Sequence, residues 1–282
     1  MVVLVTGANG QLGQSLQFIA EKHPEIEFVF CDSKKLDITD YDNVNDVFNE
    51  FIPDYCINAA AYTAVDKAES EPEKAYSINV LGPQNLSKLC KINNTVLVHV
   101  STDFVFDGTK KTPYTELDKP NPTGVYGQTK LDGEIAIQDI WEKHYIVRTS
   151  WVYSQFGNNF MKTMLRLGSE RDSLSVVNDQ IGTPTNAVDL AEALLTICLS
   201  NNQQPTTNNY GIYNFSNEGQ CSWFDFAKKI FEVNNIRINL QPIPTSSYPT
   251  PAKRPAYSVL DKSKIKSVFG LMINEWSEKI PF

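Results

Sequence analysis

Short apolar runs alternate with longer segments of helical periodicity through the first 150 residues, and this alternation constrains the fold more than any other feature. The runs are almost continuously apolar, which is typical of strands buried on both faces of a parallel sheet. We therefore expect an α/β fold, a doubly wound parallel sheet that binds ligands at the carboxyl ends of its strands. The expected strands span residues 2–6, 28–31, 54–58, 96–101 and 145–149, and the expected helices span residues 11–22, 41–51 and 72–91.

The second half of the chain has a looser pattern, which predicts a smaller lobe over residues 151–282 beside a sheet domain over residues 1–150. No clean linker separates the two, so some segments of the second half can return to the sheet domain. Pro83 lies inside the predicted helix over residues 72–91 and should kink or split it. Further helices are expected over residues 159–167, 186–199 and 222–233, an exposed polar connection over 200–209, and extended irregular chain over 242–255, which carries five prolines.

Composition and charge exclude two classes of partner. The chain has 33 acidic and 25 basic side chains, a formal charge of −8 and a pI near 5.0, so no nucleic-acid-binding surface is expected. No apolar run approaches the roughly 18 residues that cross a bilayer, and no signal peptide is recognisable. The five cysteines are scattered without a CxxC pair, so we expect buried free thiols, no metal site and a cytoplasmic location.

A glycine-rich turn follows the first apolar run. Gly7, Gly10 and Gly13 are spaced as GxxGxxG between the first predicted strand and the first predicted helix. Glycines there let the backbone turn tightly and approach a pyrophosphate, which binds to the N–H groups at the start of the helix. Asp32 ends the second run 19 residues after Gly13, close to the spacing of a carboxylate that binds the adenosine ribose. The turn therefore predicts a dinucleotide site, although glycines also mark ordinary loops.

A second candidate site lies where the fourth apolar run ends. Thr102 and Asp103 follow this run, and Tyr126 and Lys130 form a YxxxK pair at the start of a helical pattern. Residues four apart share a helix face, so an ammonium beside the phenol would lower the pKa of the phenol. A Tyr and a Lys four residues apart also occur by chance on solvent-exposed helices. The pair is a candidate site because it is expected at the carboxyl edge of the sheet, beside Thr102 and Asp103. His99, among valines in the middle of the run, is expected to be a packed strand residue.

Taken with several other segments, these motifs resemble the extended short-chain dehydrogenases/reductases, in particular the dTDP-4-dehydrorhamnose reductases. The shared segments occur in the same order from residue 1 to about residue 260. They include NAAAYTAVDKAE at residues 58–69, STDFVFDG at 101–108, RTSWVY at 148–153, NDQIGTPT at 178–185 and YPTPAKRP at 248–255. The resemblance implies a Rossmann-like nucleotide-binding domain with a C-terminal substrate-binding lobe. It also implies reduction of the C4 carbonyl of dTDP-4-dehydro-β-L-rhamnose to give dTDP-β-L-rhamnose, with NADPH or NADH as cofactor.

The same resemblance implies roles for individual residues. Catalysis is implied for Thr102, Tyr126 and Lys130. Cofactor binding is implied for Gly7, Gly10, Gln11, Leu12, Gly13, Asp32, Asp37, Ile38, Ala59, Ala60, Ala61, Tyr126 and Lys130. Substrate binding is implied for Thr63, Val65, Thr102, Asp103, Trp151 and Arg254, with Arg254 facing the diphosphate of the sugar nucleotide. The competing interpretations are that Trp151 fills the core, that Asp103 caps a loop and that Arg254 is an ordinary surface charge.

Two positions depart from the pattern of this family. Some members carry an acidic side chain in the first helix that helps to bind a metal at a dimer interface. Here that turn reads Gln14-Ser15, so neither the metal nor that dimer is expected, and the formation of a homodimer stays open. Phe104 stands where the family more often has tyrosine, which removes one hydroxyl from the edge of the substrate pocket.

Alternatives to this function stay open at the level of the sequence. A reductase of another 4-keto-6-deoxy nucleotide sugar would share the three catalytic residues, because they act on a carbonyl and not on a whole sugar. A non-catalytic regulatory subunit, resembling the β subunit of methionine adenosyltransferase, would need no proton donor. The joint presence of Thr102, Tyr126 and Lys130 therefore favours an enzyme.

The choice between the two cofactors is open as well. Asp32 favours NADH, because its carboxylate would repel the 2′-phosphate of NADPH. Lys34 and Lys35 follow it closely and could offset that repulsion. We therefore expect the two cofactors to be used with similar efficiency.

Overall fold

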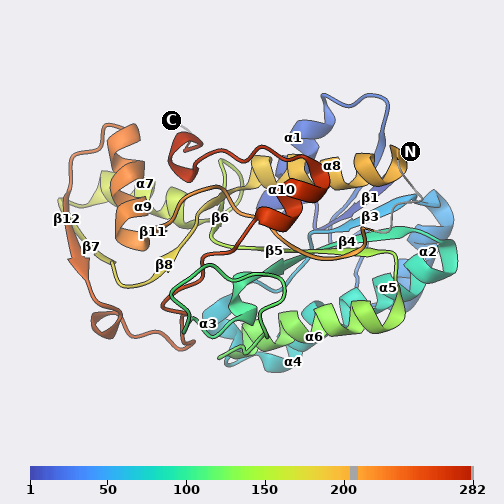
Figure 1. Ribbon diagram of the computed structural model, residues 1–282, viewed down its shortest axis with the longest axis horizontal. Coiled ribbons are helices and arrows are strands. Elements are labelled where there is room, and N and C mark those ends of the chain that lie inside the picture. Colours follow the sequence, from blue (N-terminus) through green and yellow to red (C-terminus); the bar gives the residue numbers. More distant parts are fainter. Residues whose placement is uncertain (204–208, 281–282) are drawn as a thin grey trace.

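A six-stranded parallel sheet forms the centre of the computed structural model, which describes residues 1–203 and 209–280 (Figure 1). Its strand order is β10-β5-β4-β3-β1-β2, and every neighbouring pair is parallel. The strands are β1 (Val2–Thr6), β2 (Glu27–Cys31), β3 (Tyr55–Asn58), β4 (Val96–Thr102), β5 (His144–Thr149) and β10 (Gly211–Asn214). All five expected strands belong to this sheet, and the predicted α/β fold is confirmed.

Helices cover both faces of the sheet. α1 (Gln11–Ala20) and α8 (Ala187–Gln203) pack together on one face, and α2 (Tyr41–Phe51), α5 (Gly82–Asn93) and α6 (Val125–Ile140) cover the other (Figure 1). The side chains of β1 alternate between the two faces. Val3 and Val5 join the hydrophobic cluster with α1 and α8, whereas Leu4 joins the cluster with the other helices. Because both faces are covered, the strand is apolar at every one of these positions.

The order of the strands reverses next to β1. The chain passes from β1 to β2 on one side of it and then returns to β3 on the other side. The connections diverge there and leave a crevice outside the carboxyl ends of the strands, which is where doubly wound folds bind ligands. The glycine turn after β1 and the alanines after β3 both lie at this edge.

The segment predicted as one helix over residues 72–91 is divided into three parts. α4 (Pro72–Tyr76) is followed by a π-helical turn, η1 (Ser77–Leu81), and then by α5, in whose first turn Pro83 lies. Proline has no N–H and its ring clashes with the carbonyl four residues earlier, so regular α-helical bonding is interrupted before it. The expectation that Pro83 splits or kinks this helix is confirmed.

The rest of the second half is built on a helix pair and a pair of parallel strands. α7 (Phe160–Glu170) packs on α9 (Trp223–Val233), and β7 (Ser173–Val177) pairs with β12 (Asn239–Ile243). Met161, Phe226 and Ile230 belong to the hydrophobic cluster between these elements. The remaining elements are α3 (Val65–Ala68), η2 (Asp103–Val105), β6 (Val152–Tyr153), β8 (Ile181–Gly182), β9 (Thr185–Asn186), β11 (Cys221–Ser222), η3 (Thr245–Ser247), α10 (Ser263–Phe269) and η4 (Trp276–Glu278).

Two of the expected irregular segments are partly regular. α8 continues to Gln203, so the exposed connection predicted over residues 200–209 is wrong at its start, and residues 204–208 of it lie outside the described residues. Asn201 at the end of α8 is buried. Its amide group is satisfied there, because it accepts a hydrogen bond from Tyr145 Oη (3.0 Å) and donates one to Tyr55 Oη (2.9 Å). β12 runs through Pro242, which a strand paired on one side only tolerates.

Two elements of the second half return to the sheet domain. β10 is an edge strand of the central sheet, beside β5, and α8 packs against α1 over its face. Leu190 and Leu194 of α8 share one hydrophobic cluster with Val3 and Val5 of β1. The sheet domain therefore includes parts of the chain beyond residue 150, and the division of the chain at that residue stays a prediction.

The structure also bears on the expectations drawn from composition. All five cysteines are buried free thiols, as expected. Within the described ranges, no helix has the length and apolar character needed to cross a membrane. Among residues 1–203 and 209–280, no group of three or more His, Cys, Asp or Glu side chains is placed to hold a metal ion.

Candidate functional site

A cleft of about 530 Å³ lies at the carboxyl ends of β1, β2 and β3, at the crevice created by the strand order. It brings together eight residues expected to bind the cofactor, although they come from three separate loops. These residues are Gly7, Gly10, Asp32, Asp37, Ile38, Ala59, Ala60 and Ala61. Lys74 of α4 and Ser77 of η1 line the cleft as well. The tertiary structure thus assembles most of the expected cofactor residues around one cavity.

The glycine turn leaves no room for side chains. Gly7 has a φ of +66°, and a Cβ there would lie 2.8 Å from Ala60 N on the neighbouring loop. A Cβ on Gly13 would lie 2.4 Å from Gly7 O, so the helix start packs directly on the turn. Gly10 is the N-cap of α1 and supplies no side-chain cap, so the first N–H groups of the helix have no partner within it. Such N–H groups at the positive end of a helix bind phosphate groups well.

The side chains of Gln11 and Leu12 do not line the cleft. Gln11 Nε2 donates a hydrogen bond to Val152 O (3.1 Å), and Leu12 is buried in the core beneath α1. Both side chains therefore join α1 to the rest of the fold. Only their backbone N–H groups can bind a pyrophosphate. That these two residues bind the cofactor through their backbone stays a prediction.

Asp32 lines the cleft, and hydrogen bonds hold its carboxylate in place. Its Oδ1 accepts hydrogen bonds from the backbone N–H groups of Lys34 (3.0 Å) and Lys35 (3.1 Å), and its Oδ2 accepts one from Asn9 Nδ2 (2.9 Å). These backbone hydrogen bonds lower the pKa of Asp32 below its usual value. Lys35 Nζ lies over the ring of Phe51, 4.5 Å from its centroid, and therefore faces α2. Asp32 is thus ionised at neutral pH, and Lys35 is engaged elsewhere.

Thr102 and Tyr126 meet at the carboxyl end of β4. Thr102 Oγ1 accepts a hydrogen bond from Phe104 N (3.2 Å) and donates one to Asp103 Oδ1 (3.1 Å). Tyr126, in the first turn of α6, lies beside Thr102, and the Phe104 ring packs edge-on against it at 5.5 Å between centroids. Burial raises the pKa of Tyr126 to about 12, and the neighbouring Thr102 hydroxyl opposes the shift. The phenol is therefore protonated at neutral pH and able to donate a proton.

Lys130 lies one turn later on α6 and contacts β4. Its Nζ donates a hydrogen bond to Val100 O (2.7 Å) and lies 3.2 Å from His99 Nε2. The side chain is buried, and burial lowers the pKa of Lys130 to about 8. The expectation that an ammonium beside Tyr126 lowers the pKa of the phenol is therefore wrong for this structure, because burial dominates and raises that pKa.

Asp103 is buried beside the same threonine. Burial raises the pKa of its carboxyl group to about 6, and its Oδ2 has no hydrogen-bond partner among the described residues. Thr63 is exposed in the loop after β3, and Val65 is half-buried at the start of α3. The part of these residues in substrate binding stays a prediction.

A larger cavity of about 1070 Å³ lies between α7 and the β7–β12 pair and reaches Asp66 of α3. Arg254 lines it and forms a bidentate ion pair with Asp66, with Nη1–Oδ1 at 2.8 Å and Nη2–Oδ2 at 2.7 Å. Nη1 also donates to Ala252 O (3.0 Å). The hydrogen bonds from Arg254 lower the pKa of Asp66. Arg254 is therefore not a free surface charge, since Asp66 orients its guanidinium at the wall of the cavity.

Trp151 is packed against a second tryptophan. Its ring stacks on that of Trp223, with 3.6 Å between centroids and 10° between planes. A Cβ on Gly182 would collide with the Trp151 ring at 2.6 Å, so this glycine makes room for the ring. Trp223 itself lines the larger cavity. Trp151 thus has a packing role, and a role in substrate binding stays a prediction.

A buried ionic network behind Lys130 was missed by the sequence analysis. Glu134 accepts hydrogen bonds from Arg148 Nη2 (2.6 Å), Arg148 Nε (3.0 Å) and Ser101 Oγ (2.5 Å), and so joins α6 to β5 and β4. All three side chains are at most 3% exposed. The sequence does hold a signal for this ion pair. Arg148 is a charged residue inside an apolar run, and Glu134 lies one helical turn after Lys130. Charges in such positions must find partners within the fold.

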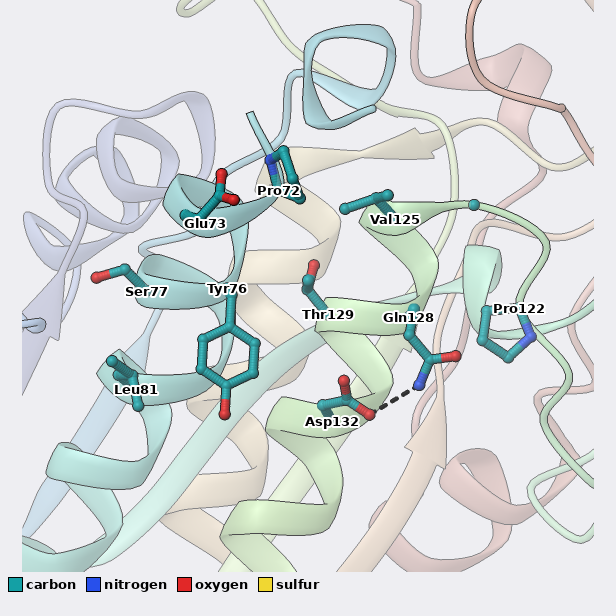
Figure 2. A pocket seen from close by; sticks show the side chains of 11 residues that line it. Pro72, Glu73, Tyr76, Ser77, Leu81, Pro122, Val125, Gln128, Thr129 and Asp132 are labelled. Carbon is teal, nitrogen blue, oxygen red and sulfur yellow. Dashed lines mark hydrogen bonds between the residues drawn. The ribbon is translucent and has the colours of Figure 1, made fainter. Parts of the chain in front are cut away.

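Figure 2 shows a third cavity, of about 640 Å³, between α6 and the α4–η1 segment. Tyr76 and Leu81 line one side of it, and Gln128 lies on the other side, hydrogen-bonded to Asp132 (2.8 Å) (Figure 2). Its lining includes none of the residues expected to bind cofactor or substrate. Ser77 lines both this cavity and the cleft of about 530 Å³, so the two adjoin.

A parallel sheet with a glycine turn at its switch point, and a threonine, a tyrosine and a lysine at the same edge, define a nucleotide-binding protein of the short-chain dehydrogenase/reductase class. A family model described as the RmlD substrate binding domain matches residues 1–281. The chain belongs to this family.

Individual relatives match the chain over nearly its whole length. A dTDP-4-dehydrorhamnose reductase from Aggregatibacter actinomycetemcomitans is 44% identical, over 99% of this chain and 96% of the relative. The crystal structure of a dTDP-4-dehydrorhamnose reductase from Clostridium acetobutylicum superposes with a TM-score of 0.92 at 45% identity, covering 99% of this chain and 96% of that one. The corresponding structure from Bacillus anthracis, in complex with NADP, has a TM-score of 0.91 at 42% identity, with the same coverage of both chains.

Proposed function

We propose that the chain is an NAD(P)H-dependent reductase that converts dTDP-4-dehydro-β-L-rhamnose to dTDP-β-L-rhamnose. One observation carries the proposal: Thr102, Tyr126 and Lys130 meet at the sheet edge that also holds the glycine-lined cleft. The names of the relatives support this substrate, and the Bacillus anthracis complex supports NADP as a cofactor.

The residues of the cleft fit a nicotinamide dinucleotide. The unpartnered N–H groups at the start of α1 would bind the pyrophosphate, and the missing side chains of Gly7 and Gly13 let it approach. Asp32 would bind the adenosine ribose, while Asp37 and Ile38 would lie near the adenine. When bound, the cofactor supplies the hydride for the reduction. The small side chains after β3 leave room for it along the sheet edge.

Tyr126 supplies the proton in this mechanism. During reduction, negative charge develops on the C4 carbonyl oxygen, which therefore needs a proton donor within hydrogen-bond reach. The neutral phenol of Tyr126 is that donor, and the Thr102 hydroxyl, which donates to Asp103 Oδ1 in the free protein, would turn to donate a second hydrogen bond to the same oxygen. Lys130 would bind the nicotinamide ribose from its buried position on α6.

The larger cavity would hold the nucleotide part of the sugar nucleotide. It lies in the smaller lobe, and Arg254 at its wall would bond to the diphosphate. Thr63, Val65, Asp103 and Trp151 would then surround the sugar. In this arrangement the smaller lobe would bind the nucleotide part of the substrate, and the sheet domain would bind the cofactor and most of the sugar.

The test is to incubate the purified protein with NADH or NADPH and the keto sugar nucleotide, and to follow the nicotinamide absorbance. We expect the absorbance to fall and the product to be dTDP-β-L-rhamnose. Oxidation of the cofactor with another 4-keto-6-deoxy nucleotide sugar, but not with this one, would favour the alternative reductase. No oxidation with any of these sugars would leave a non-catalytic regulatory subunit as the explanation.

Replacing Arg254 by alanine should raise the KM for the sugar nucleotide about tenfold or more and leave kcat nearly unchanged. A charge-assisted hydrogen bond contributes roughly 1.5–3 kcal/mol, and the diphosphate is remote from C4, so ground and transition states lose it alike. Steady-state kinetics with varied sugar nucleotide measure both constants. Asp66→Asn is the matched variant: it removes the ion pair but keeps Arg254, and we expect a smaller rise in KM. An unchanged KM in Arg254→Ala would show that Arg254 only joins its loop to α3.

The two cofactors should differ by less than about tenfold in kcat/KM, or roughly 1.4 kcal/mol. Asp32 is ionised and disfavours a 2′-phosphate, whereas Lys34 lies next to it in the same turn. Initial rates with NADH and with NADPH measure the ratio. Asp32→Asn should shift the ratio towards NADPH, and a hundredfold difference between the cofactors in the unmodified protein would contradict the expectation.

A further inference from the structure

The helix that carries Tyr126 does not cap its own start. Gly124 is the N-cap of α6 and has no side chain to offer, and the first turn of α6 holds no acidic residue. The first N–H groups of a helix have no acceptor within it, so they need partners from elsewhere. Tyr126 is the second residue of α6, so the position of its phenol depends on how well this first turn is held.

A carboxylate from a distant part of the chain caps α6 instead. Glu69 follows α3, and its Oε1 accepts a hydrogen bond from the backbone N–H of Val125, the first residue of α6 (2.9 Å). A negative charge at this end of a helix also interacts favourably with the helix dipole. Within residues 1–203 and 209–280, Glu69 forms no ion pair, so no cation draws its carboxylate away from the helix.

Gly124 leaves the space that this carboxylate occupies. A Cβ at Gly124 would lie 2.8 Å from Glu69 Oε1, and the next nearest atom is Cδ of the same side chain, at 3.9 Å. The backbone of Gly124, with φ −151° and ψ 168°, is extended and open to any residue. Ser, Thr, Asp and Asn are the usual N-cap residues, so a glycine here needs a reason. The close approach of Glu69 supplies that reason, since the backbone conformation does not.

The segment that presents Glu69 is itself packed against the start of α6. Ala68, the residue before it, is fully buried and belongs to a hydrophobic cluster against which Val125 and Tyr126 pack. The same segment continues from the loop over residues 59–64, which holds residues expected to contact the cofactor and the sugar. Glu69 therefore joins this loop to the first turn of the helix that carries the expected proton donor.

We propose that Glu69 is a positioning residue, which caps α6 across Gly124 and thereby holds Tyr126 against the substrate carbonyl. The catalytic part of this proposal rests on the proposed function. Without the cap, the first turn of α6 would fray and the phenol would lose its fixed position. Lys130 lies one turn later and is held by its hydrogen bond to Val100 O (2.7 Å), so its place would not change. A misplaced reacting group slows the chemical step even where the binding of the cofactor is unaffected.

Amide hydrogen exchange at Val125, followed by NMR of the free protein, tests the cap without substrate or cofactor. We expect exchange to be about tenfold faster in Glu69→Ala and close to wild type in Glu69→Gln, whose amide oxygen keeps an acceptor at the same reach. Gly124→Ala should have the same effect as Glu69→Ala, because its Cβ displaces the carboxylate, and it should add nothing when the two are combined. Unchanged exchange in Glu69→Ala, or additive effects of the two substitutions, would overturn the proposal.

Single-turnover oxidation of the cofactor tests the positioning of Tyr126, at a temperature at which every variant is fully folded. We expect the rate of the chemical step to fall about tenfold in Glu69→Ala and to recover in Glu69→Gln, while the Kd of the cofactor stays the same. Glu73→Ala is the matched control, because it removes an exposed carboxylate from the cavity that Gly124 also lines (Figure 2), and it should keep the wild-type rate. A wild-type rate in Glu69→Ala would overturn the positioning role.

The two measurements distinguish failure of this proposal from failure of the proposed function. A protein whose exchange at Val125 responds as expected, but which reduces none of the 4-keto sugar nucleotides, would overturn the proposed function and leave Glu69 as the cap of α6. An active reductase in which Glu69→Ala changes neither the exchange nor the rate would overturn the role of Glu69 alone.

Discussion

Replacing Tyr126 by phenylalanine is expected to lower kcat by about 10²- to 10⁴-fold, the usual contribution of a general acid. The substitution removes the proton donor and keeps the ring, so its edge-on contact with Phe104 is retained. The affinity for the cofactor should change little, because the glycine turn and Lys130 are untouched. Single-turnover measurement of cofactor oxidation gives the rate of the chemical step without interference from product release.

The matched control is Tyr76→Phe, which removes a phenol hydroxyl from the outer cavity next to the same helix (Figure 2). Tyr76 is exposed and outside the candidate site, so we expect wild-type kcat. If Tyr126→Phe retained more than a tenth of the wild-type rate of the chemical step, another group would have to be the proton donor. Burial raises the pKa of Tyr126 to about 12, so loss of its proton should not limit reduction near neutral pH.

Replacing Arg148 by methionine should reduce the free energy of unfolding by about 3–5 kcal/mol. The change leaves Glu134 as a buried carboxylate without its bidentate partner, and removing one member of a buried ion pair is strongly destabilising. Urea denaturation followed by circular dichroism measures the loss as a lower midpoint.

Two further variants distinguish the effect of burying an ion pair from the effect of removing a charge anywhere in the protein. Arg166→Met removes a pair with Glu170 that is about half-exposed, and it should change the free energy of unfolding by less than about 1 kcal/mol. The double replacement of Glu134 by leucine and Arg148 by methionine should recover most of the stability, since an apolar pair needs no charge partner. Equal losses in Arg148→Met and Arg166→Met would contradict the expectation.

The fold was largely predictable because its signals are local. The inner strands β1, β3, β4 and β5 are buried on both faces, so their runs of apolar residues are visible without knowledge of their neighbours, as at residues 2–6. The edge strand β10 is only partly buried, and it was not predicted from the sequence. Pro83 acts on its own helix by lacking an N–H, and its effect was foreseen for the same reason. Asn201 was assigned to an exposed loop because a polar residue there gives no hint of its two distant tyrosine partners.

The motifs predicted candidate site residues but not the direction of their side chains. The glycine spacing placed Gln11 and Leu12 at the start of α1, yet both side chains turn to other parts of the fold. Arg254 was expected at the diphosphate, and only the tertiary structure shows that Asp66, 188 residues earlier, holds its guanidinium. Contacts between residues so far apart in the chain leave no periodicity that a single sequence could show.

The sequence by itself determined the parallel sheet, the glycine turn at its edge, and the threonine at the end of β4 with the tyrosine and lysine after it. Periodicity and motif spacing report which faces are buried and which residue types are present, and these features need only neighbouring residues. The tertiary structure alone decided the protonation of those residues: the raised pKa of Tyr126, the lowered pKa of Lys130 and the hydrogen bond between Lys130 and His99. Protonation depends on desolvation and on nearby donors, and here both are supplied by strands and helices that are distant in the sequence.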